Sequence, residues 1–150
     1  MDEKATKTKE IVEKVLSLLG VAADVEVAPK DHSLVIEITN TESGLLIGYQ
    51  GETLRSLQHI IRLMVFSELG EETPAVVVDV EGYRKQEEEK LRVYVQKLAN
   101  LVKENNQEEV LKPMSSYKRR LIHTFVEEIP GVTTESRGEE QDRRIVIKPE

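Results

Sequence analysis

The chain of 150 residues is 39% hydrophobic, which suits one ordinary domain or two small ones. It contains no cysteine, so disulfide bonds, thiolate metal sites and cysteine nucleophiles are excluded. The formal net charge of -7 argues against non-specific binding of duplex nucleic acid, because that mode depends on many contacts between phosphates and Lys or Arg. The charge does not exclude single strands, which loops and stacking side chains recognise.

No segment of the sequence has the pattern of a membrane anchor or of a signal peptide. No apolar run approaches the length of a transmembrane helix, and the first residues lead into a charged amphipathic pattern. We therefore expect a soluble, cytoplasmic protein without direct membrane insertion.

The first half of the chain predicts a helix, a hairpin and, later, a further strand. Apolar residues recur at helical spacing over residues 8–19, and Gly20 is typical of a helix end. Residues 24–39 alternate between apolar and polar side chains around a turn at residues 29–33, as two antiparallel strands would. The apolar run at residues 75–80 has the length of a strand.

Gly48 and Gly51 stand three residues apart at the start of an amphipathic helix. Glycine adopts positive φ and lets a phosphate approach the main chain, while the next helix directs unpaired N–H groups and its positive dipole end to the same place. This arrangement suits a polynucleotide backbone. The apolar residues expected on the buried face of the helix are Leu54, Leu57, Ile60, Ile61, Met64 and Val65.

The order helix, strand, strand, glycine loop, helix, strand resembles a KH domain of the bacterial, type II kind, whose Gly-x-x-Gly loop holds about four nucleotides of a single strand. The resemblance implies an α-β-β-α-β domain. Tyr49 and Gln50 bring no cation to the loop, so we expect Tyr49 to stack on a base and Gln50 to hydrogen-bond a phosphate or base edge. The alternative is a degenerate KH fold kept for dimerisation. The nucleic-acid-binding residues expected in this half are Ile47, Gly48, Tyr49, Gln50, Gly51, Arg55 and Arg62.

The pattern changes at residue 82, so we expect one domain at residues 1–81 and a second at residues 82–150. Residues 83–106 predict one long, charge-rich helix. Its acidic start at residues 87–89 is interpreted as a solvated face.

The remaining segments predict a helix-rich second domain with a small three-stranded sheet, and hence an α+β protein of two small domains. Pro113 and the two serines after it are typical of a helix start. Arg137, Glu139 and Glu140 are interpreted as parts of a solvated turn. The strands are expected at residues 110–111, 132–136 and 143–148.

The last helix carries Arg119 and His123, which are four residues apart and therefore lie on one face. Arg119 can bind a phosphate through its guanidinium, and His123 can donate to another phosphate or stack under a base. The alternative is that both residues are structural and bond Glu135 or the sheet. The nucleic-acid-binding residues expected in this half are Lys118, Arg119, Arg120, His123, Arg143 and Arg144.

The Arg-x-x-x-His pair, with Lys112-Pro113-Met114 before it and Thr133-Thr134-Glu135-Ser136 after it, resembles the single-stranded nucleic-acid-binding domain named Arg-xxx-His (R-three-H). Combined with the upstream glycine loop and the segment Asp79-Val80-Glu81-Gly82-Tyr83-Arg84, it resembles the bacterial Jag family of SpoIIIJ-associated proteins, also called KhpB or EloR. The resemblance covers nearly the whole chain.

This resemblance implies a non-catalytic protein that binds single-stranded RNA, with single-stranded DNA as a second possible ligand. It implies post-transcriptional regulation linked to cell elongation and envelope processes, and a homodimer or a heterodimer with another small KH protein. Many members carry an amino-terminal domain and a basic linker, and we expect neither in this chain.

Two other functions compete with RNA binding. A nuclease would use His123 as a general base and Arg119 to stabilise phosphate charge, but no carboxylate pair stands at metal-binding spacing, so we expect no enzyme, metal or cofactor. A protein-interaction adaptor would use its KH domain mainly for dimerisation and offer the edge of the strand at residues 76–80 to a partner.

Overall fold

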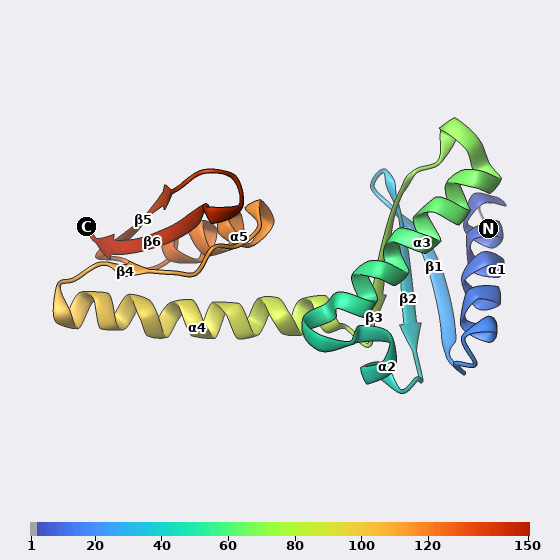
Figure 1. Ribbon diagram of the computed structural model, residues 1–150, viewed down its shortest axis with the longest axis horizontal. Helices are drawn as coiled ribbons and strands as arrows, with labels where there is room; N and C mark the ends of the chain where they lie inside the picture. The colour runs from blue at the N-terminus through green and yellow to red at the C-terminus, as the bar shows by residue number, and fades with distance from the viewer. Residues whose placement is uncertain (1–2) are drawn as a thin grey trace. The chain divides into compact units, whose positions relative to one another are not determined.

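The computed structural model describes residues 3–150 and divides into two units, one ending at Arg84 and one at Lys85–Glu150 (Figure 1). The domain boundary expected after residue 81 lies just before this division. Within residues 3–150, none of the helices has both the length and the apolar character needed to cross a membrane.

The first unit has the order α-β-β-α-α-β. Its three strands form one sheet in the order β1-β2-β3, in which β1 and β2 are antiparallel and β2 and β3 are parallel. The predicted KH-like α+β fold is confirmed, and the structure adds a short helix, α2, directly before the glycine loop. The elements are α1 (Glu3–Leu18), β1 (Asp24–Lys30), β2 (Ser33–Thr39), α2 (Ser43–Ile47), α3 (Glu52–Leu69) and β3 (Ala75–Val80).

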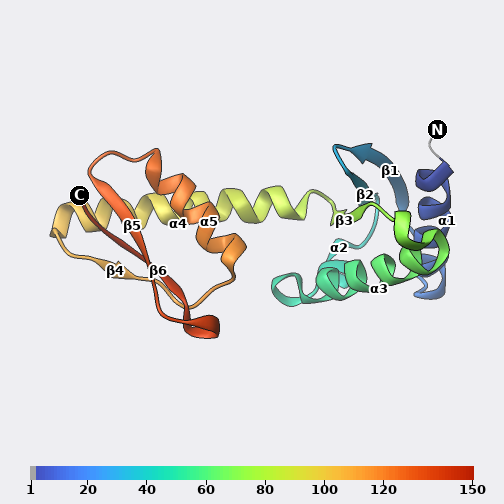
Figure 2. The same cartoon turned by 90° about the horizontal axis from the view of Figure 1, so that it is seen from above.

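The core of the first unit lies between the sheet and the two long helices, α1 and α3, which cover the same face (Figures 1 and 2). Alternate strand residues point into this core, as the two-residue period of a strand requires. The register places Ile38 beside both Val25 and Val80, and all three are buried. Glu37, one residue away, is exposed on the opposite face.

The predicted buried face of α3 is wrong at two positions. Ile60 is 50% exposed and Met64 is 36% exposed. The sheet has only three strands and α1 shares its face, so α3 buries a narrow stripe rather than a broad one. That stripe consists of Leu54, Leu57, Ile61 and Val65.

The second unit packs two helices on one face of a fully antiparallel sheet, with the strand order β4-β6-β5. Its core joins Val95 and Val102 of the long helix to Ile122 and to Ile145 and Ile147 of the central strand. The predicted helix-rich unit with a small three-stranded sheet is confirmed. The elements are α4 (Tyr83–Asn105), β4 (Glu109–Val110), α5 (Ser116–Glu127), β5 (Val132–Arg137) and β6 (Arg144–Pro149).

Candidate nucleic-acid interface

The glycine loop joins α2 to α3, and both of its glycines adopt conformations that side chains disfavour. Gly48 has φ of 68° and Gly51 has φ of 76°. A Cβ atom added to Gly48 would lie 2.1 Å from the Oγ1 atom of Thr53, which is far inside contact distance. The backbone path and the lack of space therefore both require glycine at position 48.

The loop leads directly into the amino-terminal end of α3. Gly51 is the N-cap residue of this helix, and no side chain caps the helix there. The Glu52 N–H donates to the carbonyl of Tyr49, and no capping side chain bonds the N–H groups that follow it in the first turn. A helix start without a side-chain cap is an arrangement that binds anions. Glu52 places a carboxylate in the same turn and weakens the positive field of the helix dipole.

The two variable residues of the loop are its most accessible side chains. Tyr49 is 77% exposed, and the amide nitrogen of Gln50 lies 3.4 Å from the Tyr49 hydroxyl. Gln50 itself has φ of 50°, a left-handed conformation that is uncommon for a residue with a side chain. The loop thus presents an aromatic ring and an amide to solvent, beside the backbone of Gly48.

Arg55 and Arg62 are exposed on α3, but the structure does not place both of them at the loop. They are seven residues apart, which corresponds to about 10 Å along a helix. Arg62 lies beside His59 and Phe66 in a groove between α3 and the start of β3. Arg55 therefore lies near the glycine loop, and Arg62 lies farther along α3.

One residue outside the expected set also touches the loop. Gly51 is buried, and a Cβ atom added there would lie 2.9 Å from the Cε1 atom of Tyr83. Sequence reasoning used Tyr83 only as part of the family resemblance. No local pattern connects two residues that lie so far apart in the sequence.

The second expected site lies on α5, where Arg119 and His123 both have intramolecular partners. The Nη1 atom of Arg119 donates to the carbonyl oxygen of Met114 at 2.5 Å, just before the helix begins. The Nδ1 atom of His123 is 2.6 Å from the Oγ1 atom of Thr134 on β5, and its Nε2 atom is 3.1 Å from Glu127. His123 therefore links the helix to the sheet through Thr134 rather than through Glu135.

Arg143 directly precedes the last strand and Arg144 begins it, and the two side chains lie on opposite faces of the sheet. Arg143 shares the alternation of Ile145, which faces the helices, and its Nε atom donates to the Oγ atom of Ser136 at 2.8 Å. Met114 joins Arg143 to Arg119, since its N–H donates to the Arg143 carbonyl at 3.3 Å. Arg144 alternates to the other face, so it does not join the surface of Arg119 and His123.

Lys118 and Arg120 flank Arg119 on α5, and both are exposed. Arg120 also precedes His123 by one helical turn. We call the set of Lys118, Arg119, Arg120 and His123 on α5, together with Arg143, the α5 surface.

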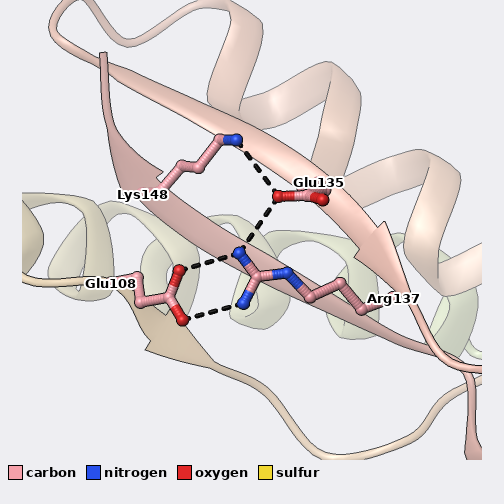
Figure 3. Close-up of polar contacts among 4 residues, drawn as sticks. All are labelled: Glu108, Glu135, Arg137 and Lys148. Atoms are coloured by element: carbon pink, nitrogen blue, oxygen red, sulfur yellow. Dashed lines mark hydrogen bonds and ion pairs between the residues drawn. The ribbon is translucent and has the colours of Figure 1, made fainter.

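Arg137 was expected in a solvated turn, and that interpretation is wrong. It is the last residue of β5 and the centre of an ionic cluster on the outer face of the sheet (Figure 3). Its two terminal nitrogens each lie 2.8 Å from an oxygen of Glu108, and one of them lies 3.0 Å from Glu135. Lys148 completes the cluster at 3.1 Å from Glu135.

Each charged group in the cluster stabilises the charged form of its partners and shifts their pKa values accordingly. Hydrogen bonds from the Arg137 guanidinium lower the pKa of Glu108 and of Glu135, and Lys148 lowers the pKa of Glu135 further. The two carboxylates in turn raise the pKa of Arg137. Arg137 is already paired and has little capacity left for a phosphate, which separates it from the cations of the α5 surface.

The described part of the chain shows no group of three or more His, Asp or Glu residues arranged to hold a metal ion.

Comparison with known proteins identifies both halves. Residues 9–69 match the KH domain of KhpA and KhpB, and residues 89–149 match the R-three-H domain expected from the sequence. Three similar proteins are each named RNA-binding protein KhpB. The chain is 32% identical to that of Clostridium symbiosum over 143 residues, and 29% identical to those of Streptococcus pneumoniae D39 and Bacillus subtilis 168.

These relatives match almost all of the chain, while the chain matches only part of them. The alignments cover 94%, 100% and 94% of the chain, in the same order, and 64%, 45% and 68% of the respective relatives. The resemblance read from the sequence is confirmed. The relatives are RNA-binding proteins, which agrees with the expectation of a protein that is not an enzyme.

Proposed function

The chain is a KhpB/Jag-like protein, in which a KH domain at residues 9–69 precedes an R-three-H domain at residues 89–149, and from this premise we propose that it binds single-stranded RNA through both units. The glycine loop would hold the backbone of one segment, and the α5 surface would hold the phosphates of another. Neither interaction involves catalysis.

The observation that carries this proposal is the geometry of the glycine loop. Gly48 and Gly51 both have positive φ and stand immediately before a helix start that no side chain caps. A phosphate placed there would accept from the N–H groups that follow Glu52 in the first turn, and Tyr49 is exposed beside it to stack on a base. Recognition by backbone N–H groups and stacking needs few cations, which suits an acidic protein.

The α5 surface supports a second contact of a different kind. Lys118 and Arg120 are exposed, and Arg119 uses one guanidinium nitrogen for Met114, which orients the side chain. The remaining guanidinium N–H groups of Arg119 would donate to a phosphate in the forked geometry that arginine favours.

The first experiment is a titration of fluorescent single-stranded RNA and of matched single-stranded DNA, repeated over a series of salt concentrations. We expect RNA binding that weakens as salt increases, because the α5 surface depends on cations. Tyr49→Ala and Arg120→Ala should each weaken it, since neither side chain supports the core. Absence of RNA binding at low salt would contradict the proposal.

A protein-interaction adaptor is the second candidate, and one observation favours a particular surface for it. Ile60, Leu63 and Met64 expose apolar side chains along α3. The edge of β3 is less suited to a partner, because the N–H and carbonyl groups of Val78 already bond Gln58 and Arg84. A homodimer, or a heterodimer with another small KH protein, would therefore use α3.

Light scattering at high protein concentration tests the adaptor. An Ile60→Ser, Met64→Ser double variant should dissociate a dimer without unfolding the unit. A wild-type protein that stays monomeric throughout the range would exclude the homodimer and leave a heterodimer to be sought by mixing with a second KH protein.

A role in post-transcriptional regulation linked to cell elongation and the envelope is supported by the family resemblance alone. We propose that this regulation takes place in the cytoplasm, where the regulated RNA is found. Deletion of the gene in its own host, with complementation by wild-type and RNA-binding-deficient chains, would test it through cell length and shape.

A further inference from the structure

The segment Asp79–Arg84, which connects β3 to α4, contributes to the family resemblance but has no place in the binding surfaces described above. The side chains of Glu81 and Arg84 in this segment form hydrogen bonds with residues elsewhere in the first unit. We infer that this segment is a support for the glycine loop and that Tyr83 is the positioning residue within it. The inference rests on the proposed function, since the loop is where RNA would bind.

The contact between Tyr83 and the loop is made against the backbone of a glycine. A Cβ atom added to Gly51 would lie 2.9 Å from the Cε1 atom of Tyr83, 3.2 Å from its hydroxyl oxygen and 3.4 Å from its Cζ atom. The edge of the ring therefore fills the space that a side chain at position 51 would occupy. Gly51 is also the N-cap residue of α3, so the ring sets the position of the N–H groups proposed to hold the phosphate.

Hydrogen bonds hold the backbone of the turn before Tyr83. The Oδ1 atom of Asp79 accepts from the N–H groups of Val80 at 3.0 Å and of Arg84 at 3.2 Å. Glu81 and Gly82 have φ of 51° and 68°, two consecutive left-handed residues that reverse the chain sharply. The Glu81 N–H donates to the carbonyl of Ile38 at 3.0 Å and ties the turn to β2.

Arg84, the residue after Tyr83, is also held by hydrogen bonds. Its Nε atom donates to the carbonyl of Val78 at 3.2 Å, and one terminal nitrogen donates to the Oε1 atom of Gln58 at 2.5 Å. The same Gln58 oxygen accepts from the Val78 N–H at 3.2 Å. Because Gln58 lies on α3, Arg84 joins β3 to the helix whose first turn Tyr83 supports. Tyr83 is thus held by bonded neighbours on both sides.

A purely structural role would give a different result from a positioning role. A tyrosine that only fills the core would lower the melting temperature when truncated and leave the loop unchanged. A positioning residue would change the loop backbone and the RNA affinity while the rest of the unit stays folded.

The test compares Tyr83→Ala, Tyr83→Phe and, as a control, Tyr94→Ala, an exposed tyrosine of the same helix. Two quantities are measured in the full chain: the affinity for a labelled mixed-sequence RNA of about eight nucleotides, enough for one loop of about four, and the amide NMR shifts of the loop. Tyr83→Ala should weaken binding about fivefold, which is about 1 kcal/mol, and shift the amides of Gly48, Gly51 and Glu52. Tyr83→Phe keeps the ring and should change both quantities less than Tyr83→Ala does, whereas Tyr94→Ala should leave both unchanged.

A folded Tyr83→Ala variant with wild-type affinity and unshifted loop amides would overturn the inference. If wild-type protein fails to bind RNA, the proposed function falls, whereas the amide shifts still decide whether Tyr83 positions the loop.

A double-mutant cycle keeps the inference testable if Tyr83→Ala does not fold. Gly51→Ala should shift the loop amides strongly in the wild-type background, because its methyl group meets the ring. In the Tyr83→Leu background the shifts should be smaller, since the flexible side chain can yield. Equal shifts in both backgrounds would show that the ring does not set the position of Gly51.

Discussion

At the scale of single residues, the two proposed surfaces differ in what their side chains must supply. The glycine loop depends on the absence of side chains at positions 48 and 51, since both residues have positive φ and little space around them. The α5 surface depends instead on guanidinium and ammonium groups. Substitutions at the two surfaces should therefore weaken RNA binding for different reasons.

Gly48→Asp should weaken RNA binding because the new side chain meets Thr53, strains the backbone and adds a negative charge beside the proposed phosphate. Gly44→Asp is the matched control, as it adds the same charge nearby at a position with open space. Fluorescence titration should show a larger loss for Gly48→Asp. Equal losses in the two variants would mean that charge alone, and not the loop backbone, determines affinity.

Arg119→Ala should reduce the affinity for RNA and lower the slope of log affinity against log salt by about one unit, the value for a single phosphate contact. Arg144→Ala removes the same charge from the opposite face of the sheet and should leave the slope near that of the wild type. The measurement is a titration at several salt concentrations. A slope that changes equally in both variants would contradict the assignment of one face to RNA.

At the scale of elements, α3 combines a narrow buried stripe with an exposed apolar surface. Ile61 is fully buried and the adjacent Ile60 is 50% exposed, although both are isoleucines in the same helix. This difference provides a direct test of the helix orientation.

Ile61→Ala should lower the free energy of unfolding by about 2–5 kcal/mol, the usual cost of removing a buried aliphatic side chain. Ile60→Ala should change it by about 0.5 kcal/mol or less, as surface substitutions do. Urea denaturation followed by circular dichroism measures both. Similar losses for the two variants would indicate that α3 is rotated or that a partner covers Ile60.

The ionic cluster on the second sheet predicts a pH dependence of stability. The folded state lowers the pKa of Glu108 and Glu135, so the unfolded state binds more protons and the stabilisation is present above the ordinary carboxyl pKa. It is lost as pH falls from the ordinary carboxyl pKa through the lowered pKa values of the folded state. Thermal melts of the wild type should therefore show a steeper decrease over that range than melts of Arg137→Met, in which the main cause of both shifts is absent. Parallel curves would show that the cluster contributes nothing to folding.

At the scale of the whole molecule, the acidic excess belongs to one half of the chain. Residues 1–84 contain 15 acidic and 8 basic residues, whereas residues 85–150 contain 13 of each. The KH half must therefore rely on backbone N–H groups and stacking, while the other half can supply cations. Two modest contacts on one chain gain from each other only when a single RNA reaches both.

RNA length should consequently change affinity in steps. An RNA of about four nucleotides can occupy only one unit, and a longer RNA that engages both should bind more tightly than either short contact predicts. The gain should disappear in Arg119→Ala and in Tyr49→Ala, each of which removes one contact. A gain with length that persists in both variants would point to a single extended site.

The sequence alone determined the order of the main elements apart from α2, and the positions of the glycine loop and of the Arg119 and His123 pair. These features are local: periods of two and of about 3.6 residues, and short motifs, can be read within one segment. Local patterns do not show which of two adjacent apolar residues faces the core. For this reason the predicted buried face of α3 wrongly included Ile60 and Met64.

Only the tertiary structure decided which distant residues meet. It brought Tyr83 against Gly51 and paired Arg137 with Glu108 on the outer face of the second sheet. The physical reason is that such contacts depend on how sheets and helices pack across long stretches of chain, and packing leaves no repeating signal in the sequence around either partner.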